Sequence, residues 1–290
     1  MQTTPGARTV TTAGLVFVLL WSSGYIAAKF GLIGSGAYTL GVLRFFGSAL
    51  LIGFWILLQR PAAASRPSDL RHAAVAGVLL QAGFFGFIYA AMRVGVSPAA
   101  AGLIAGLMPL VTALGARWLL GEPLARYAPV GMALGLAGVL LVIAPQLAQP
   151  GSALGYTLAT CALLALSGGT LYQKRHAAQL DPRVSLLMQL VASCLFLLPL
   201  AWGLEGLHIT PSLPWAGGLA WIILVNSCAG LLLYLWLLKH GGASSVSSLF
   251  FLVPPVTAGL AALVFGEALN LHEAVGFALA ALGVWLGQRR

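Results

Sequence analysis

Charged residues are scarce in this sequence, and that scarcity decides which solvent surrounds the protein. Asp, Glu, Lys and Arg make up 7% of the 290 residues, whereas 60% of the residues are hydrophobic. A water-soluble domain usually has about a quarter of its residues charged. The composition therefore excludes a soluble globular protein, and we expect an integral membrane protein without a soluble domain.

Signatures of disulfide, metal, nucleotide and catalytic chemistry are missing as well. Cys161, Cys194 and Cys228 fall in hydrophobic runs without CxxC spacing, so neither a disulfide framework nor a metal site is predicted. The G-x-x-x-x-G-K-[ST] loop of a primary pump is absent, although a separate subunit could supply one. The serines of the hydrophobic runs have no mid-span histidine or carboxylate to activate them. We expect no cofactor, no metal and no enzymatic activity.

Proton-carrying side chains are also absent from the middle of the hydrophobic runs. The acidic residues and histidines are all predicted in loops or at helix ends: Asp69, Glu122, Asp181, Glu205, Glu267, Glu273, His72, His176, His208, His240 and His272. We therefore predict facilitated diffusion or solute exchange in preference to tight proton antiport.

Hydrophobic runs of about 20 residues fill the chain, and each is long enough to cross a bilayer as a helix. The predicted spans are 12–30, 37–58, 73–92, 98–120, 127–144, 153–173, 184–204, 215–238, 244–265 and 272–288. The sequence therefore predicts an all-α membrane protein with ten transmembrane helices.

The two halves of the chain repeat each other. The stretch 107–124, LMPLVTALGARWLLGEPL, recurs without a gap at 252–269 as LVPPVTAGLAALVFGEAL, and the offset of 145 is half of 290. The same offset pairs other residues along the chain, such as Lys29 with Lys174 and Tyr89 with Tyr234. We expect one five-helix repeat over 1–145 and a second over 146–290. Five is an odd number, so the second repeat must be inverted in the membrane.

The basic residues predict the orientation. With the N-terminus inside, all but three basic residues fall at cytoplasmic ends; Lys29 and Arg93 fall at outer ends, and Arg44 lies inside a span. Both termini are thus predicted in the cytoplasm. The net charge of +9 is explained by loop charges that set orientation, and no nucleic-acid surface is expected. The first span superficially resembles a cleavable signal peptide, but it aligns with the internal sixth span, so we expect it to be retained.

Several motifs together resemble one family of transporters. The paired five-helix units, the Leu43-Arg44-Phe45 stretch and the Pro then Gly-Glu ending of the fourth and ninth spans resemble the EamA-type branch of the drug/metabolite transporter superfamily. The resemblance covers nearly the whole chain and includes bacterial exporters of aromatic and other neutral amino acids. It implies ten helices as two inverted repeats around a central cavity that opens alternately to each side, with the fifth and tenth helices peripheral.

An aromatic and polar stripe on the first span is the leading candidate for the cavity lining. Trp21, Tyr25 and Lys29 recur every four residues and so share one helix face, with Ser22 alongside. This stripe suits an amphipathic zwitterion. For Lys29 the alternative is a lysine that extends its amine to the membrane surface.

The third and eighth spans contribute further candidates. Gln81 and Asn226 are equivalent under the offset, and a mid-membrane amide must face protein, water or ligand; hydrogen bonding between helices is the equal alternative. Neighbouring candidates are Phe84, Phe85, Tyr89, Tyr234 and Trp236. Tyr89 and Tyr234 lie near helix ends, where an interfacial or gating role is as well supported as substrate contact. Tyr172 is a similar, weaker candidate.

Arg44 is the one strong charge well inside a predicted span, which requires a partner or a wet cavity. It could bind a substrate carboxylate through two hydrogen bonds, but a structural clamp is the favoured interpretation. Glu122 and Glu267 follow the fourth and ninth spans, where capping of the next helix is favoured over gating.

Prolines interrupt the fourth and ninth spans. Pro109 and Pro254-Pro255 sit mid-span, where proline removes a helical hydrogen bond and typically bends the helix. Inverted repeats exchange two conformations, with the substrate site at the midplane where they meet. These bends are candidate hinges, and a static kink is the alternative.

The sequence therefore predicts a secondary transporter of the bacterial inner membrane that exports small amphipathic metabolites, with aromatic or other neutral amino acids as the expected class. Efflux of drugs or toxic metabolites is the main alternative, and a channel or a membrane protein without transport activity is a weaker one. The expected partners are a small-molecule substrate and the lipid bilayer. Gly and Ala residues of the fifth and tenth spans face either a neighbouring helix or a second copy in a homo-oligomer.

Overall fold

The computed structural model describes residues 7–59, 66–121, 123–147, 152–176, 180–234, 236–237, 249–250, 252–266 and 270–287. The first half of this part contains α1 (Ala7–Gly34), α2 (Ala37–Gln59), α3 (Pro67–Gly77), η1 (Val78–Gly83), α4 (Phe84–Arg93), α5 (Pro98–Gly106), α6 (Met108–Leu120) and α7 (Ala128–Leu147). The second half contains α8 (Ser152–His176), α9 (Pro182–Glu205), α10 (Leu213–Trp221), η2 (Ile222–Gly230), α12 (Val253–Phe265) and α13 (Leu271–Gly287).

These helices confirm the all-α membrane fold predicted from the sequence. Within the described part of the chain, seven helices are long and apolar enough to cross a membrane, and Ala128–Val142, α12 and α13 are shorter apolar helices. The predicted third span is one continuous helix, 67–93, built from α3, η1 and α4. Residues 244–248 and 251 of the predicted ninth span lie outside the described residues, so the span is described at 249–250 and from Leu252 through α12.

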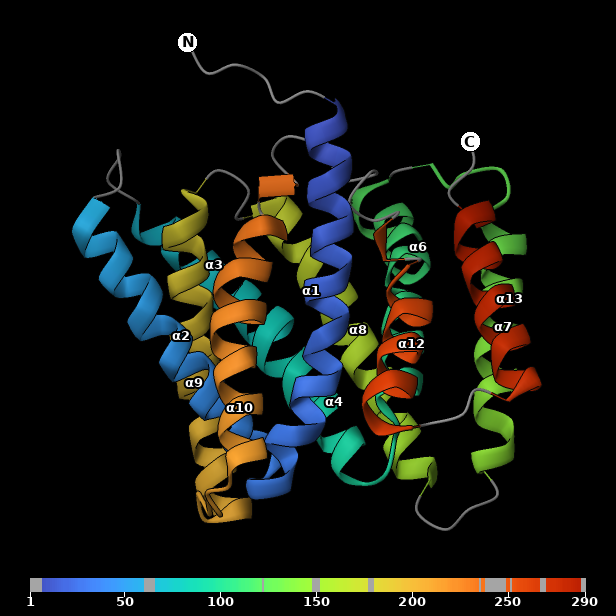
Figure 1. Cartoon of the computed structure of the whole chain (residues 1–290). Coiled ribbons are helices and arrows are strands. Elements are labelled where there is room, and N and C mark those ends of the chain that lie inside the picture. The colour runs from blue at the N-terminus through green and yellow to red at the C-terminus, as the bar shows by residue number, and fades with distance from the viewer. Residues whose placement is uncertain are drawn as a thin grey trace.

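Corresponding helices of the two halves run in opposite directions (Figure 1). The helix α1 descends from the upper face of the figure while α8 ascends, and α7 descends beside the ascending α13. Helix packing follows the same relation: α2 packs against α9 and α7 against α13. In the same way, α1 packs on the eighth span, α10 and η2, as α8 packs on the third span, α3, η1 and α4. This is the arrangement expected of two inverted units that share an axis in the membrane plane.

The pair α7 and α13 stands at one edge of the molecule (Figure 1) and is held by backbone contact. A Cβ atom on Gly131 would lie 2.4 Å from the carbonyl oxygen of Gly283, and one on Gly138 would lie 2.5 Å from that of Gly276. Only glycine allows helices to approach this closely, as in other small-residue helix contacts in membranes. The glycines thus meet a neighbouring helix of the same chain.

The fourth and ninth spans are broken at equivalent leucines. Leu107, between α5 and α6, has φ −76° and ψ −6°, and its N–H bonds the carbonyl of Ile104, three residues back. Leu252, 145 residues later, has φ −83° and ψ −15° and bonds Leu249 in the same way. Pro109 and Pro254 follow at the second position of α6 and α12, where a missing N–H is tolerated. The predicted hinge prolines therefore mark real breaks, and their movement stays a prediction.

Two π-helical segments also occupy equivalent positions. η1 spans 78–83, and the offset of 145 maps it to 223–228, inside η2. Each segment contains one of the paired amides, Gln81 or Asn226. A π turn shifts the helical ladder by one residue and frequently marks a functional site.

The lower face in Figure 1 is tied together by contacts between the two halves. The Glu205 carboxylate, at the end of α9, accepts hydrogen bonds from the backbone N–H groups of Tyr38 (3.0 Å) and Thr39 (2.7 Å) in the first turn of α2. Nearby, Ser35 and Ile209 form an isolated antiparallel bridge. A carboxylate stabilises the positive end of a helix. Glu205 therefore stabilises the N-terminus of α2, although it belongs to α9.

Candidate functional site

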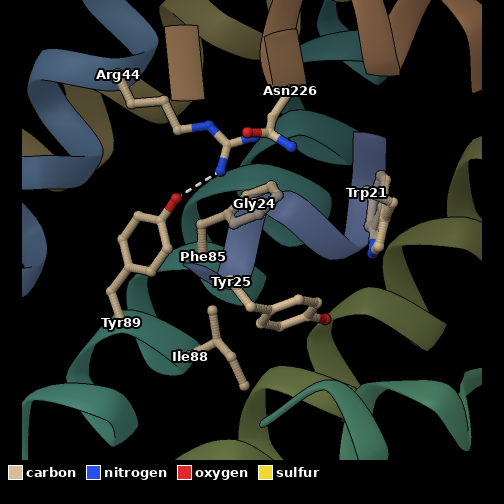
Figure 2. A pocket seen from close by; sticks show the side chains of 8 residues that line it. All are labelled: Trp21, Gly24, Tyr25, Arg44, Phe85, Ile88, Tyr89 and Asn226. Carbon is tan, nitrogen blue, oxygen red and sulfur yellow. Dashed lines mark hydrogen bonds between the residues drawn. The ribbon is translucent and has the colours of Figure 1, made fainter. Parts of the chain in front are cut away.

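A narrow cavity lies between α1, α2, α4 and η2 (Figure 2). Its lining residues are Trp21, Gly24, Tyr25, Arg44, Phe85, Ile88, Tyr89 and Asn226. The space in this cavity that the centre of a water molecule can reach is about 20 Å³. That is enough for roughly one or two waters. The cavity must widen before it can hold an organic solute.

Arg44 supplies the charge of this cavity. The side chain is 2% exposed, and its Nε donates to the Ser227 hydroxyl over 2.7 Å while Nη1 donates to the Tyr89 hydroxyl over 2.6 Å. Its guanidinium carbon lies 3.6 Å from the centre of the Phe85 ring. Within the described residues, no carboxylate forms an ion pair with Arg44. A buried charge usually has a counter-ion, and here hydroxyls and a ring take that place.

Aromatic rings form the apolar wall beside this charge. Trp21 lies 5.4 Å from both Phe17 and Phe250, measured between ring centres, and 6.4 Å from Phe84 and Phe85. These spacings are in the range of favourable ring pairs. Both halves of the chain contribute, because α1 and α4 belong to the first half and Phe250 to the second.

Several polar atoms in and near the cavity have no hydrogen-bond partner in the described structure. They include the Tyr25 hydroxyl and the Asn226 Oδ1, both of cavity-lining residues, and the Oε1 of buried Gln81. The Asn226 Nδ2 donates to the carbonyl of Leu20, which leaves its oxygen as the open acceptor. Buried polar atoms without partners are costly, so they are sites where water or a ligand would be held.

The structure brings together six of the residues singled out from the sequence. Trp21, Tyr25, Arg44, Phe85, Tyr89 and Asn226 all line the one cavity. Phe84 and Tyr234 lie behind it in the aromatic wall, at 6.4 and 6.3 Å from the Trp21 ring.

Other predicted residues lie elsewhere. Ser22 is buried and donates a 3.4 Å hydrogen bond to the carbonyl of Val253, the first residue of α12. Gln81 is buried but does not line the cavity, and Trp236 packs on the hydrophobic core. Tyr172 bonds His72 over 2.8 Å between α8 and α3.

The hinge and cap candidates complete this placement. Pro254 is buried against Gly106 of α5, whereas Pro255 is exposed. Glu122 and Glu267 lie outside the described residues, so their predicted capping roles stay predictions.

Lys29 lines a second, wider cavity at the end of α1. This cavity also contains Arg93, at the end of α4, and the turn that leads into α5. The space in this cavity that the centre of a water molecule can reach is about 400 Å³. The Lys29 Nζ lies 4.0 Å from the centre of the Phe265 ring, at the end of α12.

Sequence reasoning missed two residues that line the central cavity, Gly24 and Ile88, and one hydroxyl that bonds Arg44, that of Ser227. Gly24 is needed because a Cβ there would lie 2.8 Å from the Asn226 Nδ2; its pairing with Gly169 in the repeat was a usable signal. Ser227, the hydroxyl that receives Arg44, directly follows Asn226, and Ile88 carried no signal beyond hydrophobicity.

Comparison with known proteins gives consistent results over the whole chain. The model of the EamA-like transporter family matches residues 9–144 and again 153–287. The uncharacterized transporter YvbV of Bacillus subtilis is 25% identical over 99% of this chain and 93% of its own length. A probable amino-acid metabolite efflux pump of Salmonella typhimurium is 29% identical over 94% of this chain and 92% of its own length. One solved crystal structure superposes with a TM-score of 0.70 at 22% identity, covering 97% of this chain and 98% of the other, which shows a shared fold.

Proposed function

Because the chain belongs to the EamA-like transporter family, we propose that this membrane transporter exports small zwitterionic metabolites, with aromatic or other neutral amino acids as its substrates. In this proposal, 1–145 and 146–290 are the two inverted repeats, both termini are cytoplasmic, and the protein sits in the inner membrane. Named inner membrane transporters among its relatives, such as YedA of Escherichia coli, support that location.

The observation that supports this substrate class best is Arg44. A guanidinium that is 2% exposed, without an acidic partner among the described residues, faces a cavity. Arginine has five N–H donors, and hydrogen bonds to protein side chains are described for two of them, Nε–H and one on Nη1. A substrate carboxylate is the ligand whose charge and planar geometry fit such a group.

The rest of an amino acid finds matching groups in the same cavity. The Asn226 Oδ1 and the Tyr25 hydroxyl are open acceptors for an ammonium group. Trp21 and Phe85 offer ring faces to an apolar or aromatic side chain. A positive charge, open acceptors and ring faces that line one cavity are the recognition groups of a neutral amino acid.

Alternating access would supply the space that the cavity lacks. The breaks at Leu107 and Leu252 divide equivalent helices of the two halves, so each half contains one jointed helix. Rocking about these joints would open the cavity first to one side and then to the other. Solute exchange or facilitated diffusion fits the four described acidic residues, Asp69, Asp181, Glu205 and Glu273, which all lie at helix ends or next to them.

Efflux of drugs is the second candidate, supported by the aromatic wall around Trp21. Many such compounds are cationic, and a buried guanidinium repels cations. The charge of Arg44 therefore favours amino acids over cationic drugs.

Exchange in liposomes tests the proposal. Purified protein is reconstituted, and uptake of labelled phenylalanine, threonine and methionine is measured with and without unlabelled solute inside. Uptake that is saturable and stimulated by internal solute is the expected result, because only a carrier exchanges bound solute across the membrane. Uptake no greater than in empty liposomes for all three would overturn the amino-acid assignment.

A further inference from the structure

Arg44 has an uncharged equivalent in the second half of the chain. The offset of 145 maps it to Gln189, and the two buried side chains stand on α2 and α9, which pack against each other. The Gln189 Nε2 donates to the Gln173 Oε1 over 3.0 Å and to the Ser185 hydroxyl over 3.1 Å. A guanidinium and a carboxamide therefore take different polar partners at one position of the repeat.

The neighbours of the Arg44 guanidinium differ between the halves together with the charge. Ser227, whose hydroxyl accepts the 2.7 Å hydrogen bond from Nε, has Ala82 at the equivalent position. Phe85, whose ring centre lies 3.6 Å from the guanidinium carbon, has Gly230 there. Within the repeat, this hydroxyl and this ring are present where the cation is and absent where it is not.

Tyr89 follows a different pattern. Its equivalent is Tyr234, so a tyrosine stands at this position whether or not the cation is present. Tyr89 and Phe85 also belong to α4, in the same half as Arg44, whereas Ser227 belongs to η2 in the other half. The bond to Ser227 is therefore the one described hydrogen bond of the guanidinium that joins the two halves, and its acceptor occurs only beside the charge.

The bond to Ser227 determines how the guanidinium is turned. Phe85 lies against the group, and Tyr89 takes one hydrogen of Nη1. Several rotatable bonds separate the guanidinium from the backbone, so one hydrogen bond leaves it free to pivot, and the second bond, at Nε, fixes its plane. The other hydrogen of Nη1 and both hydrogens of Nη2 have no partner in the described part of the chain. A carboxylate binds such donors through two parallel hydrogen bonds, which need a fixed orientation.

We propose that Ser227 is a positioning residue that holds the Arg44 guanidinium so that its free N–H groups meet the carboxylate of the solute. This inference rests on the proposed function, because it explains how the central cavity selects solutes with a carboxylate. Without the Ser227 hydroxyl, Arg44 keeps its charge and its bond to Tyr89 but presents its donors at a different angle. Carboxylate selectivity therefore needs residues of both halves of the chain.

Selectivity separates this role from a purely structural one. In the liposome exchange assay, the half-saturating concentration of phenylalanine is compared with the half-inhibiting concentration of phenylalaninol, which lacks the carboxylate. Ser227→Ala is expected to raise the first at least about fivefold and to change the second by less than about twofold, because only the carboxylate uses the oriented donors. Ser227→Thr keeps a hydroxyl and is expected to retain the selectivity.

Ser48→Ala is the matched control. It removes another fully buried hydroxyl one turn from Arg44 on α2, which donates over 2.7 Å to the backbone carbonyl of Arg44 and not to the guanidinium. The change is the same in chemistry and in burial, so it is expected to leave the ratio of the two concentrations unchanged.

Ligand-induced stabilisation gives a second readout that does not depend on transport. In detergent, 3-phenylpropionate, a carboxylate without an amine, is expected to raise the apparent melting temperature of the wild type and of Ser48→Ala by about 2 °C. The increase for Ser227→Ala is expected to be less than half as large. If Ser227→Ala does not fold, Ser227→Cys replaces it in both assays, because a thiol is a weak acceptor.

The two assays distinguish failure of the inference from failure of the proposed function. Concentrations for phenylalanine and phenylalaninol that change by the same factor in Ser227→Ala overturn the inference, and so does equal or absent stabilisation of wild type and variant by 3-phenylpropionate. If either happens while the wild type exchanges phenylalanine, the proposed function stands and the positioning role fails. If the wild type exchanges no amino acid but its stabilisation by 3-phenylpropionate depends on Ser227, the positioning role stands and the proposed function fails.

Discussion

Arg44 and Tyr89 are joined by a 2.6 Å hydrogen bond from Nη1 to the phenol oxygen, and this bond links α2 to α4 beside the central cavity. The same guanidinium also bonds Ser227 of η2. Arg44 is thus a clamp between helices of both halves, and it is also the charge that faces the cavity. A ligand carboxylate bound to Arg44 would therefore change the contacts among α2, α4 and η2.

Arg44→Lys is expected to lower phenylalanine exchange at least about tenfold, because lysine keeps the charge but loses the planar pair of donors. Tyr89→Phe is the matched control: it removes one clamp bond and leaves the guanidinium in place. Exchange per folded protein and thermal unfolding in detergent are measured together. A purely structural clamp would instead give equal exchange for all folded variants, with only the melting temperature lowered.

Trp21→Ala is expected to reduce phenylalanine exchange by about tenfold and threonine exchange by clearly less. The reason is that the indole supplies a ring face that only an aromatic substrate uses in full. Trp202→Ala removes an indole that is 72% exposed on α9 and is expected to leave both activities unchanged. Equal losses for the two substrates in Trp21→Ala would mean that Trp21 does not contact the substrate side chain.

Gly138→Leu is expected to lower the apparent melting temperature by about 5 °C, because its side chain must enter the space of the Gly276 carbonyl on α13. Gly203→Leu, on α9, has open space at the corresponding atom and is expected to have little effect. Circular dichroism of the purified protein in detergent measures both. An unchanged melting temperature for Gly138→Leu would show that α7 and α13 separate without cost.

Asp181 caps α9 and pairs with Arg183 at 3.0 Å. The hydrogen bond from the Arg183 side chain lowers the pKa of the Asp181 carboxyl below its ordinary value. A lowered pKa in the folded state gives stability that is fully present above the unfolded value, about 3.9, and is lost as the pH falls through the folded value. The wild type is therefore expected to keep a constant thermal advantage over Asp181→Ala from pH 8 to pH 5. An advantage that disappears within that interval would show that the pair is not formed.

The sequence predicted the helices well and the partners of individual side chains less well. Hydrophobic length located the spans, and the four-residue spacing of Trp21 and Tyr25 correctly placed them on one lining face. Periodicity gives the face of a helix but not the depth of the cavity, so Lys29 lies in a different space from Trp21. Ser22, one residue from Trp21, is rotated by about 100° on the helix and meets α12 instead.

Long-range polar contacts had no local signal. Glu205 reaches Thr39 across 166 residues of sequence, and nothing near either residue indicated that a carboxylate from α9 would cap α2. The π segments were also missed, because their residues are hydrophobic in the same way as those of an α-helix. The hydroxyl partner of Arg44 was missed because Ser227 lies 183 residues away in the sequence.

The paired π segments have a consequence for the symmetry of the cavity. Each inserts one extra residue into a turn of its helix, and the two stand at the same place in the two halves that we propose as repeats. The halves nevertheless use these turns differently, because Asn226 lines the central cavity and Gln81 does not. A solute in that cavity therefore meets unlike surfaces from the two halves.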